Sequence, residues 1–91
     1  MKDRQIHAFF SGKVQGVGFR FTSQLLARQA GVTGWVQNLD DGRVELIAQA
    51  GAAALERFLS ELDAVMGRHI RTRDIEAEPI SQCFSDFTVR Y

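Results

Sequence analysis

The chain contains a single cysteine and a single proline, and it has no long apolar run. Cys83 cannot form a disulfide within the chain, which fits a reducing compartment. Residues 1–5 lack the apolar core of a secretory signal, and no later stretch approaches the length of a membrane-spanning helix. We therefore expect a cytoplasmic protein that does not contact a membrane.

Neither sign of charge is in excess. Eleven lysine and arginine residues balance eleven aspartate and glutamate residues, so the chain has no overall basic field that would gather nucleic acid. Its 91 residues, 45% of them apolar, are enough for one hydrophobic core but not for two. The composition predicts one globular domain over residues 1–91, and nothing in it demands more than a monomer.

Hydrophobic periodicity predicts five extended segments and two helices. The predicted strands are residues 6–14, 33–38, 44–49 and 84–91, together with a less regular extended segment at 69–78. The predicted helices are residues 21–30, with Phe21, Leu25, Leu26 and Ala30 on the apolar side, and residues 52–66, with Leu55, Phe58, Leu59, Leu62 and Met66 on the apolar side. Gly31 and Gly67 follow these helices, and Asp40-Asp41-Gly42 predicts a hairpin turn.

This order of elements predicts an α+β fold of the ferredoxin-like, split βαβ type (β-α-β-β-α-β), with two helices on one face of a mixed, largely antiparallel sheet. A right-handed crossover makes strands 6–14 and 33–38 parallel. The hairpin then places strand 44–49 between them, antiparallel to both. The carboxyl ends of strands 6–14 and 33–38 therefore meet at the same edge of the sheet, where one small ligand could touch both.

A glycine-rich loop follows the first predicted strand at that edge. It reads Gly12-Lys13-Val14-Gln15-Gly16-Val17-Gly18-Phe19-Arg20. Glycine permits a positive φ, and a turn of this kind can leave successive N–H groups facing one concavity that favours an anion. The free N–H groups of a helix start add donors, and an arginine adds a planar, charged fork. The loop predicts a phosphate site, although such a loop is more often only a tight turn.

Two other classes of function remain open on these residues. RNA-recognition domains share this order of elements, and Gly16-Val17-Gly18-Phe19-Arg20-Phe21 superficially matches their glycine-aromatic motif. In those domains, however, the aromatics lie along a central strand, whereas here they follow the first strand. A regulatory domain that binds a small anionic ligand is a further alternative. His7 is a weak candidate for a general base, and His69 and Cys83 lack metal-ligand spacing, so we expect no metal.

Both blocks of residues around the predicted site resemble the signature of the acylphosphatases, small enzymes that hydrolyse the carboxyl–phosphate bond. The first block is the glycine-rich loop from Gly12 to Arg20. The second is Gly34-Trp35-Val36-Gln37-Asn38-Leu39, followed by Asp41-Gly42-Arg43-Val44-Glu45. The resemblance extends to the closing residues 87–91. An acylphosphatase-like domain also opens larger hydrogenase-maturation proteins, but the absence of zinc-finger cysteines favours the free-standing enzyme.

The resemblance implies an enzyme that needs no cofactor and releases inorganic phosphate, which also inhibits it. Asn38 would place the attacking water through its side-chain amide. The guanidinium of Arg20 and a run of backbone amides would bind the phosphate, the amides being those of Gln15, Gly16, Val17, Gly18, Phe19 and Arg20. An acyl phosphate releases a carboxylic acid with a pKa of roughly 4 to 5, so the leaving group needs no proton from the protein. Asparagine is a poor base, and the proton of the water is expected to pass to a phosphate oxygen.

Overall fold

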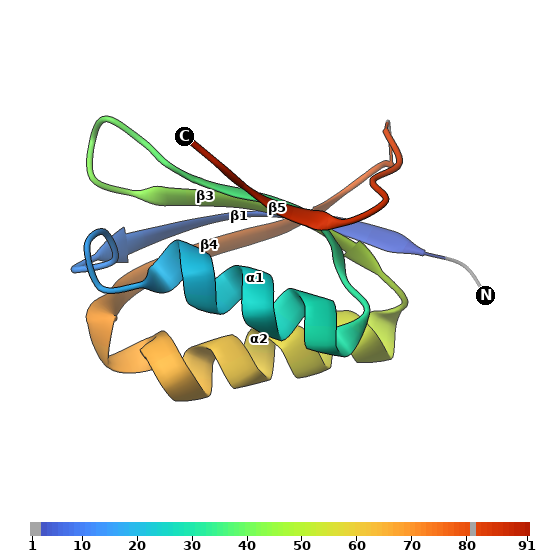
Figure 1. The fold of residues 1–91 in the computed structure, drawn as a ribbon, viewed down its shortest axis with the longest axis horizontal. Helices are drawn as coiled ribbons and strands as arrows, with labels where there is room; N and C mark the ends of the chain where they lie inside the picture. Colours follow the sequence, from blue (N-terminus) through green and yellow to red (C-terminus); the bar gives the residue numbers. More distant parts are fainter. Residues whose placement is uncertain (1–2, 81) are drawn as a thin grey trace.

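The structure, a computed structural model, describes residues 3–80 and 82–91. One sheet has the strand order β4-β1-β3-β2-β5, and α1 and α2 lie against one of its faces (Figure 1). The strands are β1 (Arg4–Gly12), β2 (Thr33–Asn38), β3 (Val44–Ala50), β4 (Ile70–Glu78) and β5 (Phe87–Arg90). The helices are α1 (Phe19–Ala30) and α2 (Ala52–Met66), and a 3₁₀ turn, Gly67–His69, joins α2 to β4. This arrangement is the expected ferredoxin-like α+β fold, with β5 added beside β2.

The pairing of the strands brings the ends of β1 and β2 to one edge. The central strand β3 is antiparallel to both β1 and β2, so these two strands run in the same direction. The loop after β1 and the β2–β3 hairpin accordingly lie at the same end of the molecule (Figure 1). The topology predicted from the order of elements is confirmed.

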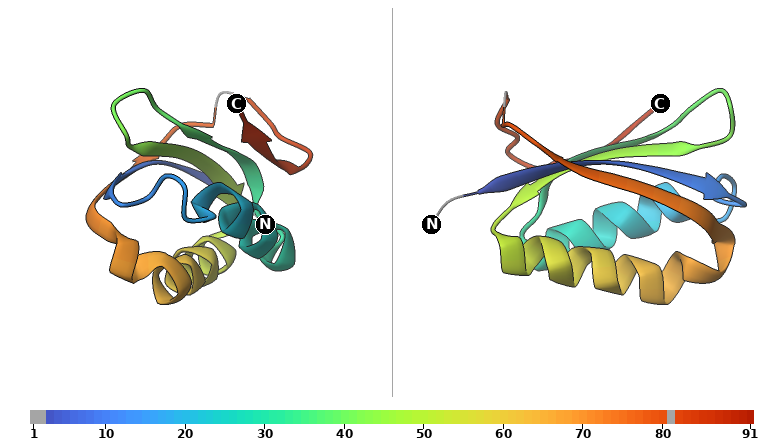
Figure 2. Two further views of the ribbon diagram at one scale, coloured as in Figure 1. Left: turned by 60° about the vertical axis from the view of Figure 1, so that its left-hand side comes forward. Right: turned by 180° about the vertical axis from the view of Figure 1, so that it is seen from behind.

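The core fills the space between the sheet and the two helices. Phe10 of β1 contacts Phe19 at the start of α1, with ring centroids 5.2 Å apart, and Phe58 of α2 contacts Phe87 of β5 at 5.9 Å. The two further views in Figure 2 show that both helices cover the same face and leave the other face free of helices. Neither helix of the described residues is long and apolar enough to cross a membrane.

The first strand and the first helix differ from the prediction at their boundaries. The strand expected at 6–14 ends at Gly12, where the register against β4 shifts and the amide of Lys13 donates instead to the carbonyl of His69 at 2.9 Å. The helix expected from Phe21 begins two residues earlier, because Phe19 is buried in the core and orders the first turn. Arg20 therefore lies inside the first turn of α1.

The predicted apolar side of α1 is wrong for two of its four residues. Phe21 is 72% exposed and Leu25 is 50% exposed, whereas Phe19, Ser23 and Ala27 face the core. Ser23 is tolerated there because its hydroxyl donates to the carbonyl of Phe19 at 2.8 Å. The stripe predicted for α2 is confirmed, with Leu55, Phe58, Leu62 and Met66 buried and Leu59 packed beside them.

The last strand is shorter than the predicted 84–91 and begins at Phe87. Asp86, just before it, accepts from the amide of Phe87 at 2.7 Å and from Arg28 of α1 at 2.8 and 3.1 Å. The hydrogen bond from Arg28 lowers the pKa of the Asp86 carboxyl and raises the pKa of the guanidinium. Residues 84–86 therefore form a loop instead of strand, and the contact between Arg28 and Asp86 fixes the end of α1 against the start of β5.

Candidate active site

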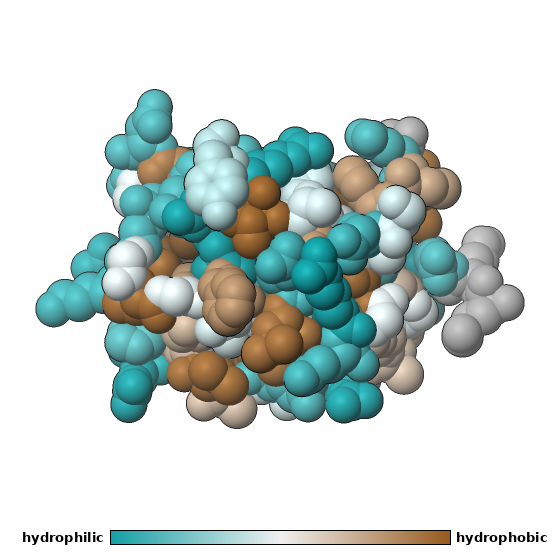
Figure 3. Space-filling model, in the orientation of Figure 1, coloured by the Kyte–Doolittle hydropathy of each residue, from teal (hydrophilic) through white to brown (hydrophobic). Residues whose placement is uncertain are grey.

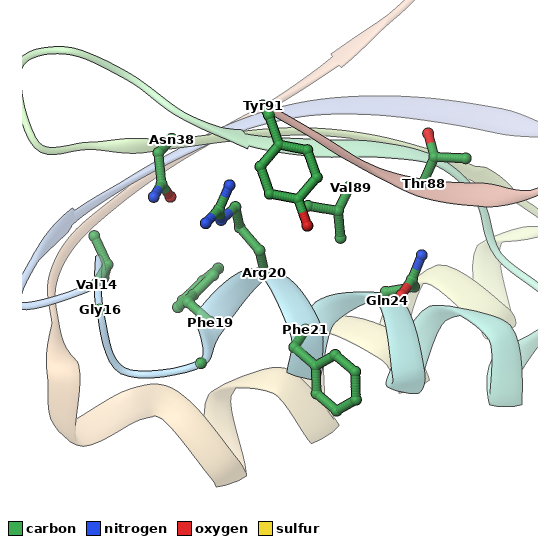
Figure 4. Close-up of a pocket in the computed structure, with 11 residues that line it drawn as sticks. Val14, Gly16, Phe19, Arg20, Phe21, Gln24, Asn38, Thr88, Val89 and Tyr91 are labelled. Carbon is green, nitrogen blue, oxygen red and sulfur yellow. The ribbon is translucent and has the colours of Figure 1, made fainter.

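A pocket of about 550 Å³ opens at the edge of the sheet where β1 and β2 end. The loop after β1 and the first turns of α1 form one side of it, and the ends of β2 and β5 form the other (Figure 4). Its lining residues are Val14, Gly16, Gly18, Phe19, Arg20, Phe21, Gln24, Asn38, Thr88, Val89 and Tyr91. The pocket thus brings together the two parts of the chain that the sequence singled out, the glycine-rich loop and Asn38.

The glycine-rich loop keeps its backbone donors free. The φ angle is +77° at Gly16 and +80° at Gly18, and no non-glycine residue of the described chain has a positive φ, so φ alternates in sign along the loop. Such alternation turns successive N–H groups toward one concavity. Within the described residues, none of the amides from Gln15 to Arg20 donates to a protein acceptor, and the first hydrogen bond of α1 runs from Thr22 to Gly18. Six successive amides are available to an anion.

Gly18 and Gly31 offer a matched test of the loop. Both have a left-handed φ, +80° and +74°, at the two ends of α1, and a Cβ at either position would meet nothing within 4 Å. We expect Gly18→Ala and Gly31→Ala each to lower the free energy of unfolding by about 1–2 kcal/mol, the cost of a left-handed alanine. Only Gly18→Ala will also weaken the binding of inorganic phosphate, because relief of its strain rotates the amides. Urea unfolding and phosphate titration measure both effects, and equal phosphate affinity in the two variants would contradict the role of the loop.

Arg20 reaches the pocket from the first turn of α1. Its guanidinium donates to the carbonyl of Arg90 at 3.4 Å and lies 4.9 Å from the centre of the Tyr91 ring. Among the residues that the structure describes, no carboxylate forms a salt bridge with Arg20. The side chain is therefore positioned by a carbonyl and an aromatic ring, and its positive charge is not neutralised by the protein.

Asn38 enters the same pocket from the opposite side, as the last residue of β2. Figure 4 shows its carboxamide and the guanidinium of Arg20 approaching each other from the strand and from the helix. The Oδ1 atom of Asn38 is buried and has no hydrogen-bond partner in the described chain. A buried acceptor without a partner costs about 1–3 kcal/mol, so a fold that keeps one needs a reason outside its own packing. Because Asn38 also lines the pocket, its carboxamide is placed beside any water molecule or ligand that enters there.

The side chain of Gln15 has a structural role that sequence reasoning missed. Its Nε2 atom donates to the carbonyls of Leu39 and Arg43, at 2.8 and 3.0 Å, and so ties the glycine-rich loop to the β2–β3 hairpin. The sequence predicted only the backbone amide of Gln15 as a contributor. No local pattern could reveal this tie, because its acceptors are backbone carbonyls 24 and 28 residues further along the chain.

His7, the candidate base considered from the sequence, lies on the sheet face without helices. Its ring nitrogens are 2.6 Å from a carboxylate oxygen of Glu45 and 3.3 Å from one of Glu78, so it links β1 to both of its neighbours. It does not line the pocket that holds Arg20 and Asn38. Across residues 3–80 and 82–91, no group of three or more histidine, cysteine, aspartate or glutamate side chains could hold a metal ion.

Comparison with known proteins agrees with the fold and the motifs. The sequence profile of the acylphosphatase family matches residues 6–89. The chain is 40% identical over 87 residues to an acylphosphatase of Yersinia pseudotuberculosis, and the alignment covers 94% of this chain and 95% of that protein. Solved structures of acylphosphatases from Bacillus subtilis (TM-score 0.87, 29% identity, 97% and 99% of the two chains) and Coxiella burnetii (0.85, 32%, 97% and 93%) have the same fold. The chain belongs to the acylphosphatase family, whose members hydrolyse acyl phosphates to a carboxylate and inorganic phosphate.

Proposed function

We propose that this chain hydrolyses acyl phosphates by direct attack of a water molecule held by Asn38 on a phosphate held by Arg20 and the amides of residues 15–20. The observation that carries this mechanism is that Asn38, whose Oδ1 atom has no partner in the described chain, lines the same pocket as Gly16, Gly18, Phe19 and Arg20, four of the six residues whose amides are free. Charge stabilisation and positioning are what phosphoryl transfer through a loose transition state requires.

The phosphate is bound by donors that the fold holds in place before the ligand arrives. A hydrogen bond to a charged group contributes about 1.5–3 kcal/mol. The amides cannot move far, because Gln15 fixes one end of the loop to the hairpin and α1 fixes the other. Arg20 adds two donors in one plane, suited to two phosphate oxygens. These groups neutralise the charge that spreads over the phosphoryl oxygens in the transition state.

Asn38 orients the nucleophile rather than activating it. Its Oδ1 atom accepts a hydrogen bond from the water, and the water oxygen bonds to phosphorus while the bond from phosphorus to the acyl oxygen breaks. The acyl oxygen departs with the bonding electron pair as a carboxylate. The proton released by the water passes to a phosphate oxygen, since a carboxamide does not act as a base. No general acid is needed, because the carboxylate is already a good leaving group: the pKa of its conjugate acid is roughly 4 to 5.

We further propose that the enzyme works as a single-domain monomer over residues 1–91, in the cytoplasm, without a nucleic-acid partner. Every group in the proposed mechanism comes from one copy of the chain. The exposed, unpaired Cys83 is compatible with a reducing compartment. The alternative, a binding module of the same fold for RNA or a small anionic ligand, lacks the support that family membership gives to the enzyme.

The test is hydrolysis of benzoyl phosphate with and without a metal chelator. We expect the same rate in millimolar EDTA as in buffer alone, because the proposed groups include no metal ligand, and we expect competitive inhibition by inorganic phosphate. Release of benzoate is followed by ultraviolet absorbance. Loss of the activity in EDTA that is restored by a divalent cation would contradict the mechanism, and binding of RNA without hydrolysis would favour the alternative.

A further inference from the structure

The pocket continues past the groups that the proposed mechanism uses. Beyond Arg20 it runs between the second turn of α1 and β5, and we call this part the α1–β5 limb. Its lining residues are Phe21, Gln24, Thr88, Val89 and Tyr91 (Figure 4). In the proposed mechanism the amides of residues 15–20 bind the phosphate and Asn38 holds the water, but neither contacts the acyl group of the substrate. The limb is the part of the same pocket that remains for it.

The limb offers no charged side chain apart from Arg20 at its inner end. Gln24 is the most polar residue of the limb, and its Nε2 atom already donates to the carbonyl of Phe87 at 3.1 Å. Phe21 and Tyr91 bring aromatic rings to the rim, and Val89 brings a branched aliphatic group that is packed against the core. A surface of this kind binds apolar and aromatic acyl groups favourably. It offers no cationic partner to an acyl group that carries a carboxylate of its own.

The direction of the reaction also favours this limb. In an in-line displacement the attacking water and the leaving oxygen lie on opposite sides of phosphorus. In Figure 4, Asn38, which would hold the water, lies on one side of the Arg20 guanidinium, and Val89 and Phe21 lie on the other side, with the Phe21 ring at the outer rim. A phosphate bound beside Arg20 therefore presents its acyl oxygen away from Asn38 and toward the α1–β5 limb.

The exposure of Phe21 fits the same role. It is 72% exposed, and Leu25, one turn further along α1, is 50% exposed, so apolar residues reach the surface over α1 in the face drawn in Figure 3. Phe21 lines the pocket and Leu25 does not. An exposed aromatic ring that continues into a polar site gives an apolar ligand group a surface to cover.

We propose that the α1–β5 limb binds the acyl group and selects acyl phosphates whose acyl group is aromatic or branched aliphatic over those with a short or a negatively charged one. This inference rests on the proposed function, because it assumes that the phosphate occupies the amide loop. Phe21 is the main specificity-determining residue, and Val89 and Tyr91 complete the surface.

The experiment compares benzoyl, acetyl and succinyl phosphate in wild type, Phe21→Ala and Leu25→Ala. For wild type we expect the highest kcat/KM with benzoyl phosphate. In Phe21→Ala, the ratio of kcat/KM for benzoyl phosphate to that for acetyl phosphate will fall by about threefold to tenfold, mainly through a higher KM for benzoyl phosphate. Leu25→Ala, which removes another exposed apolar side chain of the same helix that does not line the pocket, will keep the wild-type ratio. Both side chains are exposed, so both variants will fold.

Two results would overturn the acyl-group assignment. One is a benzoyl-to-acetyl ratio in Phe21→Ala equal to that of wild type. The other is a fall in the ratio that Leu25→Ala reproduces, which would point to a general surface effect. Failure of the proposed function gives a different result, since wild type would then hydrolyse none of the three substrates, and inorganic phosphate would not bind.

Discussion

Replacing Arg20 by glutamine will lower kcat/KM for benzoyl phosphate by at least about 10²-fold and abolish inhibition by inorganic phosphate. The guanidinium is the only cationic side chain among the residues that line the pocket, and glutamine keeps some length and polarity but removes the charge. The free energy of unfolding will change by no more than about 0.5 kcal/mol, because Arg20 makes only a long hydrogen bond to Arg90 and a stacking contact with Tyr91. Steady-state kinetics and urea unfolding measure the two effects.

Lys13→Gln is the matched control for that variant. It removes the same charge from the same loop, at the residue directly before Val14, the first residue that lines the pocket, but Lys13 itself does not line it. An effect of long-range attraction would appear in both variants and would shrink as salt rises, since charges beyond about 10 Å are screened at 0.1 M ionic strength. Direct contact predicts a large loss in Arg20→Gln alone. Equal losses in the two variants would remove Arg20 from the mechanism.

Much of the fold and the location of the site could be predicted because their signals are local or topological. The stripe of Leu55, Phe58 and Leu62 has a helical period that needs no partner to be recognised. The position of Asn38 beside the loop follows from the order of the strands, since two parallel strands with a hairpin return between them must end at one edge. Neither inference required a side-chain contact to be known.

The features that could not be predicted depend on tertiary contacts. The core-facing side of α1 is set by Phe19, which packs on Phe10 of β1, whereas the periodicity of the sequence predicts a core position for Phe21, which is exposed. The tie from Gln15 to the hairpin and the bonds of Asp86 that delay the start of β5 are likewise made to residues distant in sequence or to the local backbone. Periodicity does not encode such contacts.

Arg20 and Asn38 have different proposed roles, phosphate binding and water orientation, and steady-state kinetics can distinguish them. In the proposed mechanism the loop and Arg20 contact the phosphate itself, so their loss is expected to weaken the binding of the substrate, the product and the transition state together. Asn38 is proposed to contact only the attacking water, which is not needed for the binding of inorganic phosphate. A variant of Asn38 is therefore expected to separate turnover from phosphate affinity, whereas a variant of Arg20 changes both.

Asn38→Ala will lower kcat for benzoyl phosphate by about 10²-fold or more, because a water that is no longer oriented attacks with a far lower probability. The inhibition constant of phosphate will stay within about twofold of wild type, a difference of less than 0.5 kcal/mol. The free energy of unfolding will be unchanged or higher, because the variant removes a buried oxygen that has no partner in the described chain. Stopped assays and urea unfolding on the same preparations test all three outcomes.

Gln37→Ala is the counterpart, because Gln37 precedes Asn38 on β2 and points to the other face of the sheet. Its Nε2 atom donates to Glu45 at 2.7 Å, so the variant loses a hydrogen bond and about 1 kcal/mol of stability while it keeps wild-type turnover. The two neighbours thus give opposite results: one substitution lowers activity without lowering stability, and the other lowers stability without lowering activity. Near-normal turnover in Asn38→Ala would mean that the water is oriented by another group, and the unpartnered oxygen would then have no catalytic explanation.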